Sequence, residues 1–313
     1  MFVTNTSNFI DNPVLEMDIN CPTDEVELFG KKYRMHKDEW KKHIHLKCTN
    51  KCDARCSFCI ERDSWRDPEN SFMFLKSANE LLRQMNDQRQ LKTVSITGGE
   101  PTIFPRINDT IQTVYQYPVK LFSMNTNGRN VYAGLRKGIF RGWINISKHA
   151  IHDSLIFARQ FEVSPDTLWS IRRCQPMANI RLQCVLGTKN GLETMKDIWD
   201  FIRHYNDYTD DFSFRSLIID KDGDYVPQLF LDFRKFLFDC GWCIEQTIQD
   251  YYVYEVFKPS GGTKQITISW SNMNLLRKYN ESHYDNFLEE IIVHPDGVIS
   301  GSWNKKSLII HRP

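Results

Sequence analysis

The sequence has no long run of hydrophobic residues. No stretch approaches the roughly 18 apolar residues that a membrane span requires. Its first residues also lack a basic segment followed by an apolar one, the pattern of a secretion signal. We therefore expect a cytoplasmic protein without a membrane anchor. An excess of one charge is missing too, since the formal net charge is +1, and this gives no reason to expect nucleic acid as a partner.

A regular cysteine framework is missing as well. The chain has nine cysteines, an odd number without even spacing, and none follows Cys243. This usage is typical of a reducing compartment, where thiols stay available for metals. Single buried cysteines often behave as small apolar residues, which we expect for Cys174 and Cys184. Packing is also favoured for the pair Cys240 and Cys243, although a CxxC pair can bind a metal or cycle its redox state.

Internal repeats and low-complexity tracts are absent, and strand-like and helix-like segments alternate along the chain. Such an alternation predicts an α/β fold with a parallel sheet, because each return to a parallel strand needs a crossover. The pattern itself does not decide whether this sheet closes into a barrel. Predicted strands cover residues 43–46, 92–97, 119–124, 143–147, 179–186 and 212–219, and predicted helices cover 74–85, 107–117, a segment starting at Ser164 and Pro165, 195–205 and 229–238.

From about residue 240 the pattern changes to short strands separated by turn residues. Residues 251–257 and 265–270 predict one β-hairpin, and residues 291–293 and 298–300 predict a second. We expect this tail to form a small antiparallel element packed beside the parallel strands. The predicted organisation is therefore an N-terminal extension over 1–42, a core over 43–240 and a C-terminal β-rich extension over 241–313.

Three cysteines, Cys52, Cys56 and Cys59, lie on one predicted loop directly after the apolar segment 43–46. Thiolates are the usual ligands of iron–sulfur clusters, and three of them leave one iron of a four-iron cluster open to another ligand. Zinc is the alternative, because Cys48 could complete a set of four. Structural zinc sites usually divide their ligands between two separated pairs, and no second pair lies nearby, so the sequence favours the cluster.

The run Gly98-Gly99-Glu100-Pro101 follows the second predicted strand. Two glycines let the backbone approach a ligand closely, and the carboxylate that follows can bind an ammonium group. Alone, this motif is a weak signal. A simple glycine turn explains the two glycines, but not their position about forty residues after the cysteine triad.

Together, the cysteine spacing, with an aromatic residue before the last cysteine, and the GGEP run resemble the signature of the radical S-adenosylmethionine (SAM) superfamily. The chain is similar to its MoaA-like members over residues 43–240. The resemblance implies a partial (β/α)6 barrel with a small C-terminal antiparallel β extension. It also implies one [4Fe-4S] cluster, held by Cys52, Cys56 and Cys59, and SAM as cofactors.

The resemblance implies further contacts to SAM at the strand ends, where active sites of parallel barrels lie. The GGEP motif would hold the amino group of the methionyl part, and the backbone of Phe58 would lie near the adenine. Turn chemistry is the alternative role for the asparagines that follow the third strand, Asn125 and Asn127. The implied SAM-binding residues are Phe58, Gly98, Gly99, Glu100, Pro101, Asn125, Ser147 and Gln183.

The sequence assigns no catalytic acid, base or hydrogen donor. His149 and His152 follow the fourth predicted strand, but loop histidines are more often surface or packing residues. The segment 291–303 is similar to the entry into the SPASM or twitch extensions of the family. Residues 300–303 nevertheless contain no cysteine where one is expected, so we predict a single cluster without a complete auxiliary-cluster domain.

These expectations describe an oxygen-sensitive radical SAM enzyme with an external reductant such as flavodoxin or ferredoxin. Reductive cleavage of SAM would yield a 5'-deoxyadenosyl radical, which abstracts hydrogen from the substrate. A small polar metabolite of the nucleotide or sugar type is favoured, because peptide-recognition features are absent. A ribosomally made peptide is the alternative with the same mechanism, and a non-catalytic, zinc-stapled binding protein is the alternative of a different class.

Overall fold

The computed structural model describes residues 23–36, 43–56, 59, 67–152, 161–186, 191–216, 228–248, 252–259, 264–271, 286–288, 290–303 and 308–313. The chain divides into two compact units. The first, which we call the motif unit because it holds both sequence motifs, comprises residues 21–147, 152–181 and 284–313. The other, which we call the second unit, comprises residues 1–20, 148–151 and 182–283.

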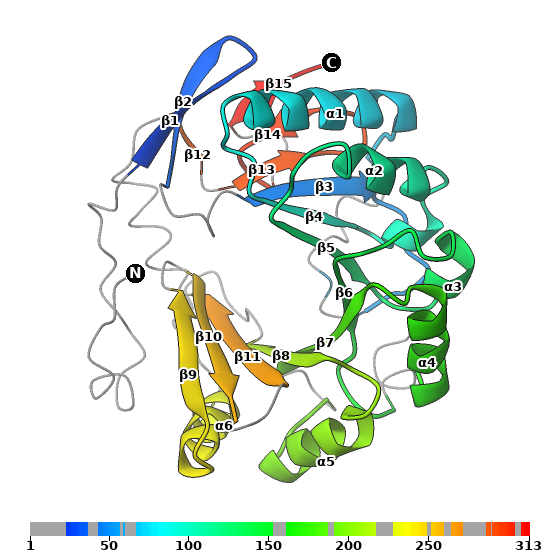
Figure 1. The fold of residues 1–313 in the computed structure, drawn as a ribbon, viewed down its shortest axis with the longest axis vertical. Coiled ribbons are helices and arrows are strands. Elements are labelled where there is room, and N and C mark those ends of the chain that lie inside the picture. Colours follow the sequence, from blue (N-terminus) through cyan, green and yellow to red (C-terminus); the bar gives the residue numbers. More distant parts are fainter. Residues whose placement is uncertain are drawn as a thin grey trace. The chain divides into compact units, whose positions relative to one another are not determined.

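The motif unit is built on parallel strands (Figure 1). Its sheet has the order β15-β14-β13-β3-β4-β5-β6. Strands β13, β3, β4, β5 and β6 run parallel, and β14 is antiparallel to its two neighbours, β13 and β15. These strands are β3 (His43–Thr49), β4 (Thr93–Gly98), β5 (Leu121–Thr126), β6 (Trp143–Ser147), β13 (Glu290–Val293), β14 (Ile299–Ser300) and β15 (Ile309–His311). The helices of this unit are α1 (Ser71–Asp87), the 3-10 turn η3 (Pro101–Ile103), α2 (Ile107–Val114), α3 (Val131–Gly134) and α4 (Pro165–Cys174).

Side chains alternate between two faces along these strands, as the pleat requires. The apolar face carries fully buried residues such as Ile96, Met124 and Ile146. Helices α1 and α2 supply Leu81 and Ile111, which are also fully buried. The opposite face carries mainly polar residues. This division leaves the polar row free to build a site.

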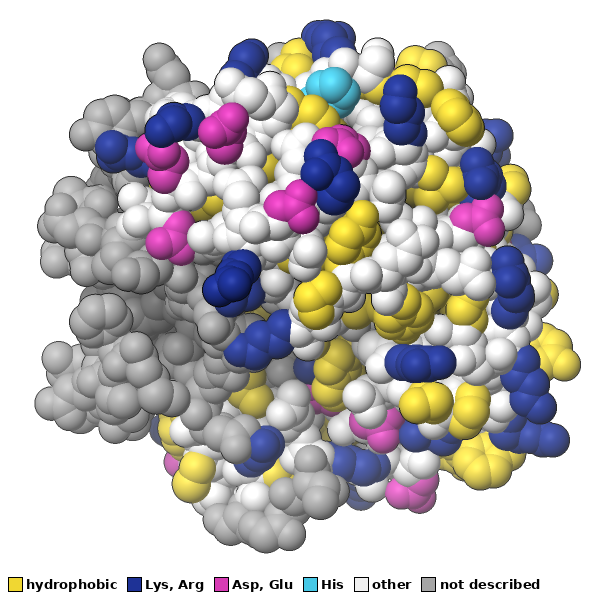
Figure 2. Space-filling model, turned by 45° about the horizontal axis from the view of Figure 1, so that its top comes forward, with side chains coloured by type: hydrophobic (Ala, Val, Ile, Leu, Met, Phe, Trp, Pro, Cys, Tyr) yellow, Lys and Arg dark blue, Asp and Glu magenta, His cyan; other side chains and the backbone are white. Residues whose placement is uncertain are grey.

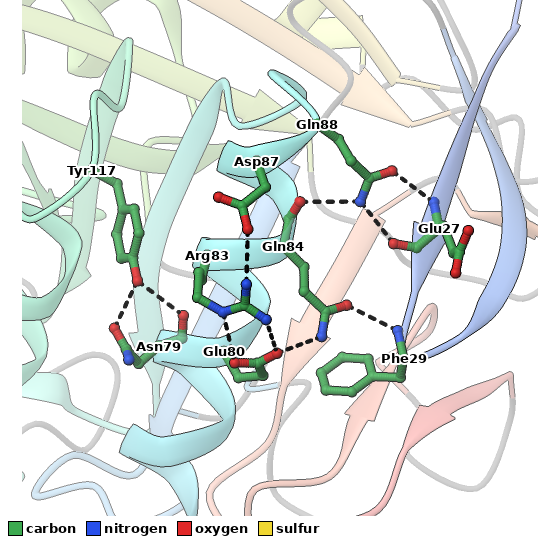
Figure 3. A network of polar contacts seen from close by, with 9 residues as sticks. All are labelled: Glu27, Phe29, Asn79, Glu80, Arg83, Gln84, Asp87, Gln88 and Tyr117. Carbon is green, nitrogen blue, oxygen red and sulfur yellow. Dashed lines mark hydrogen bonds and ion pairs between the residues drawn. The ribbon is translucent and has the colours of Figure 1, made fainter.

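Helix α1 begins at the cap residue Asn70, whose side chain accepts a hydrogen bond from the backbone of Met73. Its outer side holds an N-terminal hairpin that the sequence did not predict (Figure 3). Gln88 and Gln84 accept hydrogen bonds from the backbone N–H groups of Glu27 and Phe29, at 2.8 and 2.9 Å. This hairpin consists of β1 (Thr23–Leu28) and β2 (Lys31–His36), and β2 also pairs with β12 (Phe287–Leu288).

The second unit contains strands in the order β7-β8-β11-β10-β9. A buried ion pair joins its helix α6 to β10, since Arg234 donates to both carboxylate oxygens of Glu255 at 2.6 and 2.7 Å. Its elements are β7 (Asn179–Leu186, of which the residues from 182 onward belong here), α5 (Met195–Tyr205), β8 (Asp211–Ser216), α6 (Gln228–Asp239), β9 (Cys243–Ile248), β10 (Tyr252–Lys258) and β11 (Gln265–Ser271).

The predicted α/β class with parallel strands is confirmed, and the arrangement is consistent with a partial (β/α)6 barrel. The predicted bounds of β6, β7 and α5 match those of the structure. Helix α4 starts with a capping box between Ser164 and Thr167 and with Pro165 in its first turn. No helix in the described part of the chain has the length and apolar character needed to cross a membrane.

Both C-terminal hairpins are present, but the prediction that they form an element beside the parallel strands was wrong. Strand β11 pairs in parallel with β8, and β13 pairs in parallel with β3. The hairpins therefore extend the sheets themselves. Local turn and strand signals showed that hairpins exist, but they carry no information about which distant strand edge each hairpin joins. The predicted limits at residues 42 and 240 stay a prediction.

Candidate functional site

The two sequence motifs meet where β3 and β4 end. Thr49 at the end of β3 is the pairing partner of Gly98 at the end of β4. Beyond this pair, the N–H of Gly99 donates to the Thr49 carbonyl at 2.8 Å, and the N–H of Glu100 donates to the Lys51 carbonyl at 2.8 Å. The cysteine triad begins at the next residue, Cys52. Backbone hydrogen bonds therefore fix the glycine turn against the start of the cysteine loop.

This contact requires glycine at both positions. Gly98 has a φ of 139°, a conformation that residues with a side chain rarely adopt. A Cβ atom at Gly98 would lie 2.3 Å from the Thr49 carbonyl oxygen, and one at Gly99 would lie 2.1 Å from the Lys51 carbonyl oxygen. Both distances are far below van der Waals contact, and backbone atoms cannot rotate away. Any side chain here would separate the two motifs.

Glu100 is the centre of a buried hydrogen-bond network. Its Oε1 accepts from the Thr102 N–H at 3.0 Å, the Thr102 hydroxyl at 2.5 Å and the Thr126 hydroxyl at 2.6 Å. Its Oε2 accepts from the Asn127 N–H at 2.6 Å. The side chain is fully buried, and this burial raises the pKa of the carboxyl group, while the four donors oppose the shift. The carboxylate thus links the end of β4, η3 and the end of β5.

The three cysteines of the triad are half-buried and form no disulfide. The Cys59 N–H donates to the Cys56 carbonyl at 3.2 Å, and the Cys52 thiol accepts from the Ala54 N–H at 3.4 Å. Burial raises the pKa of Cys52 to about 11, so binding of iron there displaces a proton. Three accessible thiols on one loop fit the ligand set of a four-iron cluster.

Within the described residues, no three His, Cys, Asp or Glu side chains are close enough together to hold a single metal ion. Cys48, the fourth ligand of the zinc alternative, is buried on β3 and donates to the Thr97 carbonyl at 3.5 Å. Its burial raises the pKa of the thiol well above the usual range.

The other predicted roles of cysteines have mixed outcomes. Cys174 and Cys184 are buried, as predicted for small apolar residues. Cys240 and Cys243 are exposed, so the prediction that this pair packs was wrong. Cys240 follows the end of α6 and Cys243 begins β9, and the turn between them presents both thiols to solvent.

Asp53, which the sequence analysis did not identify, holds the cysteine loop to the turn after β5. Its two carboxylate oxygens accept from the side-chain amides of Asn127 and Asn130 at 2.6 and 2.7 Å. Arg129 lies 3.6 Å from the same carboxylate. An acidic residue between two cysteines, together with an asparagine-rich turn, was the available sequence signal. For Asn127 the turn role is supported, because its side-chain oxygen also accepts from the Arg129 N–H.

Asn125 and Ser147 lie at neighbouring strand ends of the motif unit. The Asn125 side-chain oxygen accepts from the side-chain amide of Asn145 at 2.9 Å. The side-chain oxygen of Asn145 itself is buried and has no hydrogen-bond partner among the described residues. A buried acceptor of this kind is costly unless a further group donates to it. The pair therefore fits the edge of a polar ligand site.

The remaining predicted site residues are placed as follows. Ser147 ends β6 and is half-buried, and Pro101 opens η3 and is buried. Gln183 lies on β7 in the second unit, where its carbonyl accepts from the Lys148 N–H. Phe58 lies outside the described residues.

A second polar group on the same face of the sheet was missed by the sequence analysis. His45 contacts the Ser95 hydroxyl at 2.7 Å through Nδ1 and the Glu290 carboxylate at 2.8 Å through Nε2. Its ring also lies beside those of His43 and Trp303, at centroid distances of 4.4 and 4.8 Å. The three strands β13, β3 and β4 bring these residues together, although residues 45 and 290 lie far apart in sequence.

The two histidines that follow the fourth strand differ in their environment. His149 is buried, and its Nδ1 accepts from the Val185 N–H at 3.1 Å. His152 is exposed and lies 3.1 Å from the Glu162 carboxylate. Each has a structural partner, which agrees with the expectation that such histidines pack or lie at the surface.

The fold and the site define an α/β enzyme in which parallel strand ends bring a three-thiol loop and a glycine turn together. The family model for the radical SAM superfamily matches residues 46–204, about half of the chain, and the chain belongs to this superfamily. Its cofactors are therefore a [4Fe-4S] cluster and SAM. The predicted family, enzyme class and cofactors are confirmed.

Curated relatives resemble only part of this chain. GTP 3',8-cyclase of Clostridium perfringens (strain SM101 / Type A) is 31% identical over 92 residues, which are 28% of this chain and 27% of the relative. Probable GTP 3',8-cyclase of Sulfolobus acidocaldarius is 32% identical over 118 residues, or 36% of each chain. The chain thus spans between a quarter and two fifths of the length of these relatives.

Solved structures show a weaker likeness. The match to native anSMEcpe with bound AdoMet and Cp18Cys peptide covers 63% of this chain and 58% of that chain, with 12% identity and a TM-score of 0.42. Native anSMEcpe with bound AdoMet alone gives 13% identity and a TM-score of 0.41. At these TM-scores the likeness supports no inference about substrate.

Replacing Gly99 with alanine is expected to separate the two motifs. The new Cβ would lie 2.1 Å from the Lys51 carbonyl oxygen, so the turn has to move away from the cysteine loop. We expect SAM affinity, measured by equilibrium dialysis, to fall about tenfold or more, as a displaced binding loop loses its pre-organisation. Gly138→Ala is the control, because position 138 has open space and should cost only about 1–2 kcal/mol for its left-handed backbone. Equal SAM affinity in both variants would contradict the role of the Gly99 contact.

Replacing Glu100 with glutamine is expected to destabilise the protein. All four partners of the carboxylate are donors, and the amide NH2 group cannot accept from any of them. At least one buried donor then stays unpaired, which costs about 1–3 kcal/mol of unfolding free energy in urea titrations. The control Glu80→Gln lies on the outer side of α1 and should cost about 0.5 kcal/mol or less. Equal free energies of unfolding for the two variants would contradict the stabilising role of the Glu100 network.

Proposed function

We propose that this enzyme cleaves SAM reductively at a [4Fe-4S] cluster held by Cys52, Cys56 and Cys59, and that it abstracts hydrogen from a small polar metabolite of the nucleotide or sugar type. One observation carries the proposal. The glycine turn and the cysteine loop, separated by a strand and a helix in sequence, are joined by two backbone hydrogen bonds. A cluster on the loop and a ligand on the turn would then be neighbours.

The proposed SAM site consists of the turn Gly98 to Pro101, together with Phe58, Asn125 and Ser147 as predicted from the family pattern, and a role for Gln183 stays a prediction of that pattern alone. The glycines let the turn approach both the loop and a ligand. Since the Glu100 carboxylate is fully buried and accepts four hydrogen bonds, we assign it a positioning role, in which it holds the turn in shape for the methionyl part of SAM.

The chain's own residues orient the reactants in this proposal. Asp53 fixes the cysteine loop to the turn after β5, and the orphaned side-chain oxygen of Asn145 offers an acceptor beside Asn125. The bound cluster and SAM supply the electron transfer and the radical that removes hydrogen, and the protein supplies position and exclusion of water. No described residue is assigned as a catalytic acid or base.

The preference for a polar substrate rests on the polar face of the motif unit's sheet. This face carries hydrogen-bonding groups at successive strands, among them His45, Ser95, Asn125 and Asn145. Most of these groups pair with one another, but the buried side-chain oxygen of Asn145 has no hydrogen-bond partner among the described residues, and a ligand with a donor group would satisfy it. The partial similarity to proteins named GTP 3',8-cyclase supports a nucleotide among polar candidates. The external reductant would be a flavodoxin or a ferredoxin.

Loss of one cluster ligand should abolish both iron binding and the reductive cleavage of SAM. After anaerobic reconstitution with iron and sulfide, we expect the protein to bind about four irons per chain and to release 5'-deoxyadenosine from SAM with dithionite. Cys56→Ala should lose both the bound iron and SAM cleavage. Cys240→Ala, which removes an exposed cysteine, should keep both. A colourless wild-type protein with one zinc per chain would overturn the proposal, and an intact cluster in Cys56→Ala would remove that residue from the ligand set.

Deuterium transfer should identify the substrate class. The holoenzyme is incubated with SAM, dithionite and one candidate at a time, from a panel of deuterated nucleotides, nucleotide sugars and short peptides. We expect deuterium in 5'-deoxyadenosine only with a nucleotide or sugar compound, since a carbon–hydrogen bond of the substrate donates to the radical. Mass spectrometry of the product measures the transfer. Labelling by a peptide alone would contradict the proposed substrate class without affecting the cluster assignment.

A further inference from the structure

Strands β8, β11 and β10 lie side by side in the second unit (Figure 1). Helices α5 and α6 cover one of their faces, where Phe214 of β8 contacts Phe201 of α5 and Phe233 of α6 at ring-centroid distances of 6.2 and 5.0 Å. Side chains alternate along a strand, so the residues on either side of Phe214, and of Ile268 on β11, lie on the opposite face. We call this opposite face the hydroxyl face; its residues on β8 and β11 are Asp211, Ser213, Arg215, Gln265, Thr267 and Ser269.

Two buried hydroxyl groups on the hydroxyl face have no described partner. Thr267 and Ser269 are 5% and 0% exposed, and neither Thr267 Oγ1 nor Ser269 Oγ has a hydrogen-bond partner among the described residues. Burial of a hydroxyl group without a hydrogen bond is costly, so such groups usually have a protein or ligand partner. Because the two residues are two positions apart on one strand, both side chains lie on the same face. The two hydroxyls therefore indicate a place for a ligand that can bond to both.

Neighbouring strands place further polar groups beside these hydroxyls. Ser213 is opposite Thr267, and Arg215 is opposite Ser269, in the parallel pair of β8 with β11. Tyr254 is opposite Ser269 in the antiparallel pair of β10 with β11. Arg215 and Tyr254 are half-buried, so the face is accessible beside Ser269. This end lies near the C-terminal ends of the parallel strands β8 and β11, the edge at which active sites of parallel barrels lie.

The far end of the hydroxyl face combines an acceptor with a donor. Asp211 is fully buried, and its Oδ2 accepts from the side-chain amide of Gln265 at 3.0 Å. A carboxylate only accepts hydrogen bonds and the guanidinium of Arg215 only donates them, whereas a hydroxyl group does both. A ligand that matches this series must itself donate and accept along its length. Adjacent hydroxyl groups of a sugar or a linear polyol do so, but a phosphate dianion only accepts.

The charges near the hydroxyl face do not select an anion. Arg215 is near one end of the three strands, and Asp211 and Lys258 are near the other, so cations and a carboxylate are mixed. On the surface drawn in Figure 2, acidic side chains also lie among the lysines and arginines. The net charge of the chain is +1. These described surfaces therefore lack the field of one sign that would steer a phosphate or another polyanion.

We propose that the hydroxyl face binds the polyhydroxyl part of the substrate, a sugar ring or a linear polyol. In this complex the hydroxyls of Thr267 and Ser269 exchange hydrogen bonds with adjacent ligand hydroxyls, and Arg215 donates to a ligand oxygen. The role of this ligand as the substrate rests on the proposed function, whereas its binding does not require SAM cleavage. The inference narrows the substrate class from polar metabolites to compounds with adjacent hydroxyl groups.

Removal of the two hydroxyls tests the hydroxyl face in the reconstituted holoprotein. Isothermal titration calorimetry measures the binding of D-ribose, D-glucose, myo-inositol and UDP-glucose. We expect at least one of them to bind, and Thr267→Val/Ser269→Ala to raise its Kd about tenfold or more, because two hydrogen bonds are lost. An analogue that lacks one hydroxyl of the bound compound should bind the wild type more weakly. The same substitutions should weaken this analogue less than they weaken the complete compound.

The matched control is Thr113→Val/Ser170→Ala, which removes two hydroxyls from helices α2 and α4 of the motif unit and should leave the Kd unchanged. The Thr267/Ser269 variant should unfold at the same urea concentration as the wild type or a higher one, because neither hydroxyl has a described partner to lose.

The hydroxyl face is disproved as a binding site if no compound of the series binds, if the wild type and the Thr267/Ser269 variant bind equally, or if the control is weakened as much. Binding of inorganic phosphate that the Thr267/Ser269 variant weakens would replace the polyol by an anion and overturn the inference. A wild type that fails to cleave SAM with dithionite refutes the proposed function, and the titration still decides the hydroxyl face.

Discussion

The close approach of two backbone segments is the constraint on which the candidate site depends. The N–H groups of Gly99 and Glu100 donate to the carbonyls of residues 49 and 51, and neither Gly98 nor Gly99 has room for a Cβ atom. Because β3 and β4 are parallel neighbours, their ends lie at the same edge of the sheet. The sheet brings the segments to the same place, and the missing side chains let them touch.

Two carboxylate networks, one around the buried Glu100 and one around the half-buried Asp53, extend this contact to the third strand. Glu100 joins the glycine turn to Thr126 and Asn127 at the end of β5, and Asp53 joins the cysteine loop to the same turn. The cysteine loop, the glycine turn and the β5 turn are therefore held by charged hydrogen bonds, which are shorter and stronger than neutral ones. These contacts restrain the described parts of the three segments, and a site restrained in this way loses less entropy on binding.

The motif unit presents different chemistry on different surfaces. One face of its sheet is polar and contains a buried acceptor without a partner among the described residues, whereas its helical side carries the exposed aromatic residues Tyr132 and Trp169. The cysteine loop is linked to both, through Glu100 and the glycine turn on one side and through Asp53 and Asn130 on the other. Family membership establishes the radical SAM class, while similarity to curated relatives covers too little of their length to fix the substrate.

The sequence by itself determined the local elements and the ligand types. Proline and serine at the start of α4, the β-branched run of β4 and the spacing of Cys52, Cys56 and Cys59 are short-range signals, and the structure bears out the first two. Only the tertiary structure decided which groups meet. It buried Glu100 under four donors, exposed Cys240 and Cys243, and joined the C-terminal hairpins to β8 and β3. These outcomes depend on the pairing and register of strands far apart in sequence, and periodicity along one strand carries no information about its neighbour.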